Sequence, residues 1–251
     1  MTPLHDTILR HLRTHHFERM EPLAALIDMD GTLYDSMGGH SLAWHTLADE
    51  IGIPSTREEF YLYEGRTGAS TLDILFQRAY GRDATDEEKE RLYRRKTEIF
   101  AGMEPPRPMP GAREMLGVLM EAGLRRVLVT GSGQSSLISR LDRDFPGAFL
   151  PGMRVTSRDV THGKPHPEPF IRAMQIARVK PSQAIAIENA PLGVKAAAES
   201  GAFTIAVTTG PIPRQEMERA GATVIYDSMP ALAADLPALL LQLFTVKDCC
   251  K

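Results

Sequence analysis

Residues 26–36 read Leu26-Ile27-Asp28-Met29-Asp30-Gly31-Thr32-Leu33-Tyr34-Asp35-Ser36. The apolar residues 23–27 predict a buried strand that runs directly into two carboxylates, Asp28 and Asp30. Open α/β sheets bind their ligands at the carboxyl ends of strands, and Gly31 permits a turn that brings backbone N–H groups near an anion. One aspartate of such a pair can serve as an ionised nucleophile and the other as a protonated acid. The alternative is a solvated turn, because Asp and Gly are common turn residues.

The bulk properties are those of an ordinary globular protein. The chain has 251 residues, enough for one large domain or two smaller ones, with 43% hydrophobic and 24% charged residues. A net charge of −3 gives no general attraction for nucleic acid or anionic lipid. We find no apolar run that could span a bilayer, no apolar signal core in residues 1–6, and only two cysteines, Cys249 and Cys250. We therefore predict a cytoplasmic protein without a nucleic-acid or membrane partner.

Residues 1–22 are predicted to be an N-terminal helical extension. Its apolar residues are spaced as in a helix, which either packs on the core or stays mobile. His11, His15 and His16 also lie at helical spacing. A metal site is one interpretation, but no acidic or cysteine partner is nearby, so we favour a solvated face.

Residues 38–106 carry a helical pattern with no strand candidate. Gly38-Gly39 is interpreted as a hinge, and residues 102–111 contain the densest prolines of the chain and form a second linker. Ser55-Thr56-Arg57-Glu58 and Thr85-Asp86-Glu87-Glu88 are predicted capping boxes that begin helices. A helical block between two hinges, inserted after the first strand, predicts a cap domain.

The remainder alternates between strands and helices. The further strand candidates are residues 126–130, 153–156, 184–187, 203–207 and 223–225. Such alternation implies a mainly parallel sheet with helices on both faces. Because the first strand must join this sheet across the insertion, we predict an α/β fold. Its Rossmann-like core comprises residues 23–37 and 107–251, and its cap is all-helical.

Three further polar signals follow strands or lie in the loops between them. Residues 130–132, Thr130-Gly131-Ser132, offer hydroxyl and backbone N–H groups to phosphate oxygens, although a plain Ser/Gly loop is the alternative. Lys164 lies in a loop stiffened by three prolines, which suggests that its ammonium is directed rather than simply exposed. Glu188 and Asn189 end a buried strand with oxygen ligands suited to Mg²⁺, unless Asn189 only caps a helix.

The order of these signals resembles the haloacid dehalogenase-like (HAD) superfamily. The matching motifs are Asp28-x-Asp30, Thr130, Lys164 and Glu188-Asn189. The helical block resembles the C1 cap of the β-phosphoglucomutase-like branch, whose His-x-x-Ala-Trp start is similar to His40-Ser41-Leu42-Ala43-Trp44. The resemblance covers about residues 23–228 and leaves both tails outside it.

This resemblance implies a phosphoryl transfer in two steps. Asp28 would attack phosphorus to form an aspartyl phosphate, while Asp30 would protonate the leaving group and then activate water. Mg²⁺ would be held by Asp28, the backbone carbonyl of Asp30 and the 188–189 pair. Thr130 and Lys164 would hold the remaining phosphate oxygens under a closed cap. The second aspartate indicates a phosphatase rather than a dehalogenase, and a capped chain needs no second copy, so we expect a monomer.

Two positions depart from the family pattern. Asn189 stands where the family usually has an aspartate, which predicts weaker or altered Mg²⁺ affinity. In the cap loop, Glu64 and Gly68 replace the lysine and arginine that serve the second phosphate of the mutase substrate. A reversed charge at this point should defeat that binding mode, so mutase activity is not expected.

The cap glutamate bears on the predicted substrate. Either Glu64 is a solvated bystander and Arg66 contacts the anion, or Glu64 binds a phosphate-bound metal, as in Mg-pyrophosphate. The predicted substrate-binding residues are His40, Glu64, Arg66, Gly131 and Ser132. Residues 64–71, 129–134 and 188–193 resemble a HAD-type inorganic pyrophosphatase. The leading prediction is therefore hydrolysis of inorganic pyrophosphate, and the alternative is a phosphatase of small sugar phosphates.

A signalling receiver domain is the competing class, because such domains also form an aspartyl phosphate on an α/β sheet. Receiver domains lack an inserted helical cap and an acid/base aspartate two positions after the nucleophile. Both features are predicted here, so an enzyme is favoured.

Overall fold

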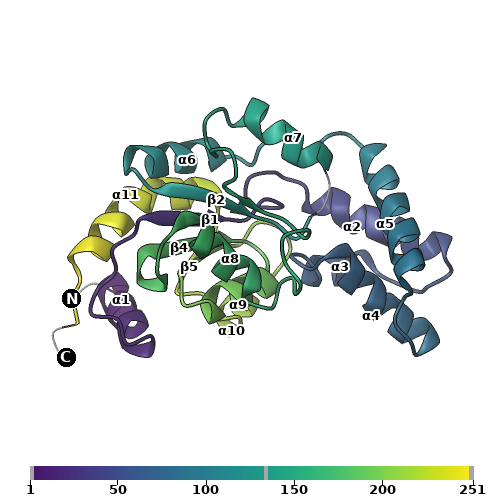
Figure 1. Cartoon of the computed structure of the whole chain (residues 1–251), viewed down its shortest axis with the longest axis horizontal. Coiled ribbons are helices and arrows are strands. Elements are labelled where there is room, and N and C mark those ends of the chain that lie inside the picture. Colours follow the sequence, from purple (N-terminus) through teal and green to yellow (C-terminus); the bar gives the residue numbers. More distant parts are fainter. Residues whose placement is uncertain (1–2, 133–134, 249–251) are drawn as a thin grey trace.

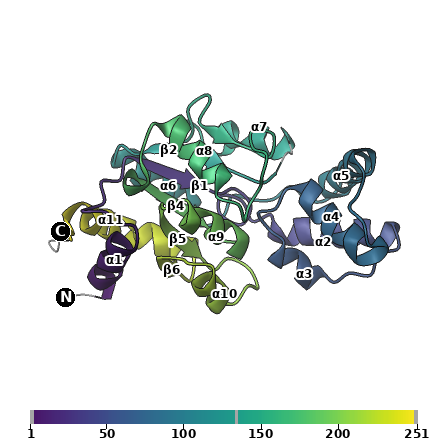
Figure 2. The same cartoon turned by 60° about the horizontal axis from the view of Figure 1, so that its bottom comes forward.

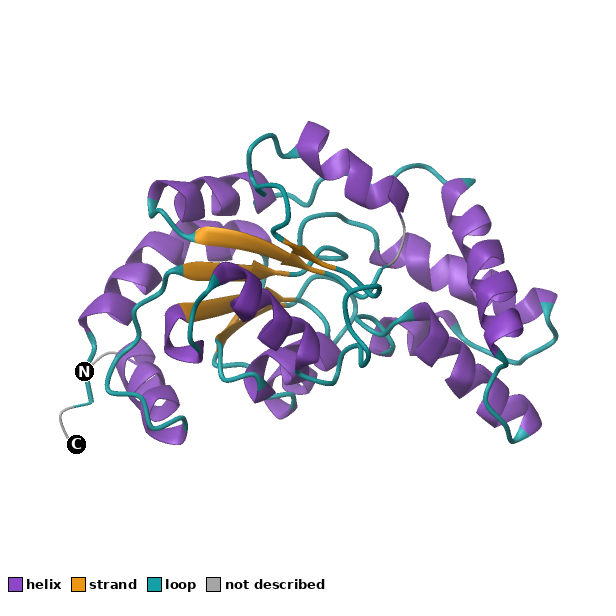
Figure 3. Ribbon diagram, in the orientation of Figure 1, coloured by secondary structure: helices purple, strands orange, loops and turns teal. Residues whose placement is uncertain are grey.

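The computed structural model describes residues 3–132 and 135–248, and its centre is one parallel sheet. The strands are β1 Ala24–Ile27, β2 Arg125–Val129, β3 Arg154–Val155, β4 Ala184–Glu188, β5 Phe203–Val207 and β6 Val224–Tyr226. They are ordered β3-β2-β1-β4-β5-β6, and every neighbouring pair is parallel. Figure 3 shows this sheet between layers of helices. The predicted α/β class and Rossmann-like parallel sheet are confirmed.

The strand register explains why the polar signals meet. Ile27 in the central strand β1 pairs with Leu128 of β2 on one side and Ile187 of β4 on the other. The next residues, Asp28 and Glu188, therefore lie at the same level at the carboxyl edge of the sheet, with the end of β2 beside them. The carboxyl ends of neighbouring strands thus place the predicted site residues at one edge of the sheet.

Helices cover both faces of the sheet (Figure 1). The helices of the core are α1 Pro3–Thr14, α6 Ala112–Glu121, α7 Ser135–Asp144, α8 Glu168–Ala177, α9 Pro191–Glu199, α10 Arg214–Arg219 and α11 Met229–Thr245. Ala25 and Ile27 of β1 pack in one apolar cluster with residues of α1, α6 and α11. Ala24 and Leu26 point the other way, into a cluster with residues of α8 and α9. This alternation makes β1 fully buried.

Four helices inserted after β1 form the cap. They are α2 Met37–Glu50, α3 Arg57–Leu62, α4 Gly68–Tyr80 and α5 Asp86–Ala101. They make a separate lobe beyond the carboxyl edge of the sheet (Figures 1 and 2), with its own core around Trp44, Phe60 and Leu75. The inserted helical cap agrees with the predicted architecture. The domain boundaries at residues 22/23, 37/38 and 106/107 stay predictions.

Two local predictions in the cap are wrong. Gly38-Gly39 is not a hinge but lies inside α2, where a Cβ at Gly39 would come within 3.0 Å of the Phe100 ring. This glycine therefore allows the close approach of α2 and α5.

The first capping box begins at Thr56 rather than Ser55. The Thr56 hydroxyl accepts from the Glu59 N–H at 3.3 Å, and the Glu59 carboxylate accepts from the Thr56 N–H at 3.2 Å. The box at Thr85 is confirmed.

The N-terminal helix packs on the core. Ile8 and Leu12 of α1 are fully buried, and His11, which shares their face, is only 6% exposed. The His11 ring lies edge-on to Phe203 at 5.2 Å between centroids. The predicted solvated face is therefore wrong for His11. Among the helices described, none is both long and apolar enough to cross a bilayer.

Burial of His11 predicts a loss of stability in acid. Burial, and secondarily the charge of His15, lowers the pKa of His11 from 6.5 to about 3. Because the folded pKa lies below the unfolded one, the unfolded chain binds more protons between these values, and stability falls as the pH drops from 6.5 to 3. The loss from this group approaches roughly 4 kcal/mol at the acid end.

The measurement is urea unfolding across this pH range. We expect His11→Leu to reduce the fall in the free energy of unfolding between pH 6.5 and 3. His166→Gln, a change at an exposed histidine, should leave this fall unchanged. If the free energy of unfolding fell equally steeply with decreasing pH in wild type and in His11→Leu, His11 would not be the cause of the fall.

Candidate active site

Asp28 lies directly after β1 and is 5% exposed. Its backbone N–H donates to the Ile187 carbonyl at 3.0 Å, and its Oδ1 accepts from Lys164 Nζ at 2.6 Å. Burial first, then the negative charge of Glu188, raises the pKa of Asp28 to about 8, although Lys164 acts in the opposite direction. Lys164 alone does not offset burial and the Glu188 charge. The carboxylate is thus fixed in place, and a second cation beside it would favour its ionised form.

Lys164 is the cation behind Asp28. The side chain is buried, and Nζ donates to Asp28 Oδ1 at 2.6 Å, to Glu188 Oε1 at 2.5 Å and to the Val129 carbonyl at 3.0 Å. Burial alone would lower the pKa of Lys164, but the two carboxylates outweigh burial and raise it above its ordinary value. The predicted directed ammonium is therefore present, because three acceptors match the three N–H groups of Lys164.

Glu188 and Asn189 face different ways. Glu188 Oε2 accepts from the N–H groups of Asn189 and Ala190 at 2.9 and 3.0 Å, while its Oε1 accepts from Lys164. A Cβ at Gly193 would lie 1.9 Å from Glu188 Oε1, so this packing requires a glycine there. Asn189, in contrast, lines the cavity in front of Asp28. The geometry favours Asn189 as the metal contact and Glu188 as the residue that positions Lys164.

The oxygen donors at this edge fit Mg²⁺. The Asn189 side chain lies against the turn at Gly31, where a Cβ would come within 1.9 Å of Asn189 Nδ2. Gly31 also has a φ of 84°, a conformation that favours glycine. Asp28, Asp30 and Asn189 line one cavity, and their carboxylate, backbone carbonyl and carboxamide groups are hard oxygen donors, the type that Mg²⁺ prefers.

Asp30 ends a chain of buried polar groups. Its Oδ1 accepts from Ser36 Oγ at 2.7 Å and from His40 Nε2 at 2.9 Å, and Lys96 Nζ donates to His40 Nδ1 at 2.7 Å. An ammonium can only donate, so Nδ1 is the acceptor and the neutral His40 ring carries its proton on Nε2. Phe100 stacks on the ring at 4.1 Å between centroids. Both His40 nitrogens are engaged, so the structure places this predicted substrate contact as a positioning group for Asp30.

Burial and neighbouring charges set the protonation states of the hydrogen-bonded groups Asp30, His40 and Lys96. Burial alone would raise the pKa of Asp30, but its interaction with His40, the Ser36 hydrogen bond and the charge of Lys96 hold it below its ordinary value. Burial and the Lys96 charge lower the pKa of His40. Burial also lowers the pKa of Lys96 to about 8, against the opposing charges of Glu64 and Asp30. Asp30 is therefore ionised, with a proton donor directly behind His40.

Lys96 was not predicted from the sequence. It lies on α5 between Leu92 and Phe100, and all three side chains are buried. Residues 92, 96 and 100 recur at four-residue spacing, so they share one helix face. A lysine in the middle of an apolar stripe is the signal that could have identified it.

The cap loop supplies the opposite wall of the cavity. Glu64 and Arg66 line it together with Thr130, Gly131 and Ser132 of the core. Burial, followed by the charge of Asp30, raises the pKa of Glu64 to about 8.

Hydrogen bonds hold both of these loops. Arg66 Nη1 donates to Ser70 Oγ at 3.2 Å, whereas its buried Nε finds no partner among the described residues. On the core side, Thr130 Oγ1 accepts from the Ser132 N–H at 3.0 Å. The five predicted substrate-binding residues thus share one cavity.

The cap is closed onto the core in this structure. A Cβ at Gly131 would lie 2.4 Å from the Gly65 carbonyl oxygen and 2.8 Å from that of Arg66. Likewise, a Cβ at Gly163 would lie 2.5 Å from Thr67 Cγ2. The cavity between the cap and the core has a volume of about 40 Å³. Since one water needs about 10–15 Å³ by this measure, the space holds only a small ligand.

A methyl group at Gly131 should therefore obstruct closure. The atoms that the Gly131→Ala side chain would meet are backbone carbonyls, which cannot rotate away as a side chain could. We expect kcat/KM to fall at least about tenfold, because an active-site misplacement of about 1 Å can cost about 100-fold. The matched control is Gly117→Ala in α6, where nothing lies within 4 Å of the added Cβ. Equal steady-state kinetics for the two variants would refute the importance of this contact.

A parallel sheet with an aspartate pair at its carboxyl edge, a buried lysine and a helical cap defines a hydrolase of the haloacid dehalogenase type. The family profile described as haloacid dehalogenase-like hydrolase matches residues 23–201, and the chain belongs to this family.

Relatives within the family are β-phosphoglucomutase-like. A solved structure from Bacteroides vulgatus, provisionally assigned as a β-phosphoglucomutase, has a TM-score of 0.92 and 42% identity, covering 96% of this chain and 98% of that one. The phosphorylated carbohydrates phosphatase of Thermotoga maritima is 28% identical over 179 residues, 71% of this chain and 81% of the relative. The β-phosphoglucomutase of Bacillus subtilis is 26% identical over 195 residues, 74% of this chain and 84% of the relative.

Proposed function

We propose that this protein is a Mg²⁺-dependent phosphatase of small phosphorylated carbohydrates that works through an aspartyl phosphate on Asp28. The observation that carries the proposal is the Asp28 carboxylate, held by Lys164 at 2.6 Å, with Asp30 beside it at the same cavity. The relatives' names support the substrate class. They back the sugar-phosphatase alternative better than the leading sequence prediction of a pyrophosphatase.

In the first step, the Asp28 oxygen that does not contact Lys164 attacks phosphorus, and the bond from phosphorus to the leaving oxygen breaks. The leaving oxygen takes a proton from Asp30. Asp30 is ionised at rest, so it must first receive this proton from His40 Nε2. Lys96 then donates a proton to His40 Nδ1 through the 2.7 Å contact, which keeps the ring neutral. The lowered pKa of Lys96, about 8, makes that ammonium a competent donor.

In the second step, Asp30 removes a proton from water, which attacks phosphorus and releases phosphate from Asp28. The proton returns through His40 to Lys96, so Asp30, His40 and Lys96 regain their starting protonation states after each turnover. The Asp28 carboxylate, the Asn189 carboxamide and the Asp30 backbone carbonyl would hold Mg²⁺, whose positive charge would offset the repulsion between the carboxylate and the phosphoryl group. The Thr130 hydroxyl and the loop of Gly131 and Ser132 hold the phosphoryl oxygens.

Inorganic pyrophosphate is a second candidate substrate, and the small volume of the cavity is the observation in its favour. The closed cavity of about 40 Å³ suits a more compact ligand than a sugar phosphate, for which the cap would have to stay further open. Glu64 and Lys96 project from the cap into this cavity, where Glu64 could share a metal ion with a second phosphate. The free Arg66 Nε is the proposed anion contact for either substrate.

The test is phosphate release with Mg²⁺ from pyrophosphate, β-glucose 1-phosphate and several hexose phosphates, with Asp28→Asn as the blank. We expect a sugar phosphate to give the highest kcat/KM. A lead of pyrophosphate by more than about tenfold, lost selectively in Glu64→Gln, would select the second candidate instead. Hydrolysis of none of these compounds would contradict the phosphatase proposal as a whole.

A further inference from the structure

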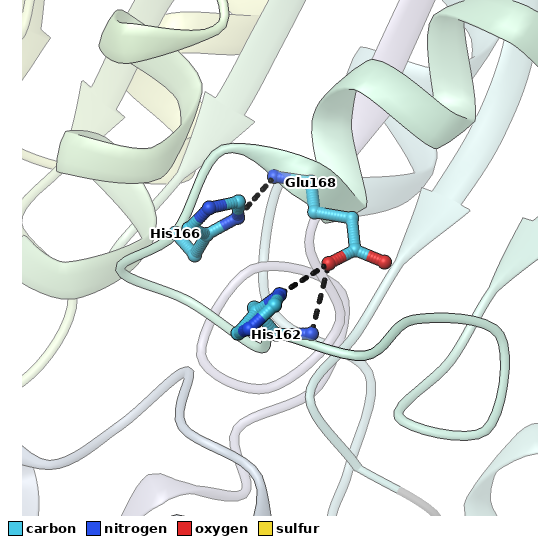
Figure 4. Close-up of side chains that lie close together, drawn as sticks. All are labelled: His162, His166 and Glu168. Atoms are coloured by element: carbon cyan, nitrogen blue, oxygen red, sulfur yellow. Dashed lines mark hydrogen bonds and ion pairs between the residues drawn. The ribbon is translucent and has the colours of Figure 1, made fainter.

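A second group of potential metal ligands lies outside the candidate active site, in the loop that carries Lys164. His162, His166 and Glu168 each offer one ligand atom, and these atoms lie within 4.8 Å of one another (Figure 4). We propose that these three residues bind a divalent transition-metal ion, with Zn²⁺ as the representative ligand. This inference goes beyond the proposed phosphatase function and does not depend on it.

The Glu168 carboxylate is already oriented. Oε1 accepts from the Thr161 N–H at 2.8 Å, and Oε2 accepts from the His162 N–H at 2.9 Å. His162 Nδ1 lies 3.1 Å from the same Oε2 (Figure 4). An ion between Nδ1 and Oε2 would replace the proton that this pair shares. One oxygen and one nitrogen ligand are therefore placed side by side before any ion arrives.

The third ligand lies beside this pair. The Glu168 N–H donates to His166 Nδ1 at 3.2 Å, so in the neutral ring the lone pair is on this nitrogen, and a bound ion would replace the Glu168 N–H as its partner. The two imidazole rings lie 4.8 Å apart between centroids. His166 stands between Pro165 and Pro167, which restrict the backbone on both sides. A restricted loop loses little conformational freedom when its ligands close on an ion.

The donor set selects the kind of ion. Two imidazoles and one carboxylate suit Zn²⁺ and similar borderline ions, whereas Mg²⁺ prefers oxygen donors of the type that Asp28 and Asn189 offer. His162 and His166 are exposed, and they line a surface cavity of about 510 Å³ that reaches the cap at Arg66 and Ser70. An ion can therefore enter from solvent and keep water as a further ligand.

The position of the site gives the ion a structural consequence. Lys164 lies in sequence between His162 and His166, and its Nζ is held by Asp28 and Glu188. A bound ion would join the two sides of this loop to the first turn of α8. Binding to the folded chain alone would also raise thermal stability, because the unfolded chain lacks the arranged ligands.

The experiment is titration of the full chain with Zn²⁺ by calorimetry, in saturating Mg²⁺ so that the oxygen site is filled. We expect one Zn²⁺ per chain and a higher melting temperature. The double variant His162→Ala/His166→Ala should lose this binding by more than the roughly 10–100-fold that outer-shell changes cause. Glu168 is left intact because it also holds the loop backbone.

The control is His15→Ala, since His15 lies 4.5 Å between ring centroids from His11 and forms the rival histidine pair. This variant should bind Zn²⁺ as wild type does. Three results would overturn the proposal: no Zn²⁺ bound by wild type, undiminished binding by the double variant, or loss of binding in His15→Ala. Circular dichroism verifies that each variant is folded, and the single variant His166→Ala repeats the test if the double variant is not.

Discussion

Asp28→Asn is expected to abolish turnover, with kcat reduced at least about 10⁴-fold. An amide cannot form the acyl phosphate, and nucleophile deletions in other hydrolases cost roughly 10⁴ to 10⁶-fold. The amide keeps the size of the side chain, and removing one of two neighbouring buried carboxylates also relieves repulsion with Glu188. We therefore expect the loss in kcat without a loss in melting temperature. Phosphate release under saturating substrate and Mg²⁺ is the measurement.

The control for this prediction is Asp35→Asn, which changes an exposed aspartate at the end of the same turn. It should keep kcat within about threefold, because exposed changes away from special sites are usually near neutral. An Asp28→Asn enzyme that retained more than a hundredth of wild-type activity would rule out Asp28 as the nucleophile.

Lys164→Met should cause the largest loss of stability at the site. The ammonium is the shared partner of the buried Asp28 and Glu188 carboxylates, at 2.6 and 2.5 Å. Removing one partner of a buried ion pair costs roughly 3–5 kcal/mol, because the remaining charges lose their compensation. In the variant the folded pKa of Asp28 rises still further above its unfolded value. The folded state then binds more protons than the unfolded state, so the variant loses stability as the pH rises.

Urea unfolding at about pH 9.5 and about pH 6.5, on either side of the wild-type Asp28 pKa of about 8 and with metal removed by EDTA, measures this effect. The deficit of Lys164→Met relative to wild type should be larger at the higher pH. Lys195→Met in α9 is the matched control, because that lysine is exposed and its nearest carboxylate, Glu199, is 3.8 Å away. Equal free energies of unfolding for the two methionine variants would contradict the buried-pair account.

The sequence alone was sufficient to predict the architecture and the central residues of the candidate active site. An apolar strand followed by Asp28 and Asp30 predicted the carboxyl edge, and the alternation of strands and helices predicted the parallel sheet. Once that order is known, the sheet geometry brings Thr130 and Glu188 beside Asp28, since neighbouring parallel strands end at one level. The catalytic role of Lys164 was predicted from the family resemblance and the proline-rich loop, whereas its contacts with Asp28 and Glu188 were not predicted.

Other features depended on contacts that no local pattern encodes. The spacing of Leu92 and Phe100 indicates that Lys96 is buried, but only packing of α2 against α5 brings it to His40. Gly38-Gly39 was interpreted as a hinge because glycine is also used for close packing, and a sequence alone does not separate the two uses. The burial of His11 likewise arises from Phe203, nearly two hundred residues away in the chain.

The substrate is the least predictable part, because it depends on how far the cap opens. Glu64 could be assigned to the cavity from the motif, and the structure places it there. The same glutamate is compatible with a phosphate-bound metal or with a polar sugar. The relatives' names then favour sugar phosphates, whereas the size of the closed cavity favours a compact ligand.

The most direct test of the central claim is to capture the covalent intermediate. Enzyme mixed with saturating substrate and Mg²⁺ is quenched in acid during turnover, digested, and examined by mass spectrometry. The account predicts a peptide that contains Asp28 and is heavier by one phosphoryl group, seen in wild type and missing in Asp28→Asn. Hydrolysis with inversion of configuration at phosphorus, and with no such peptide at any quench time, would show direct attack by water and contradict the account.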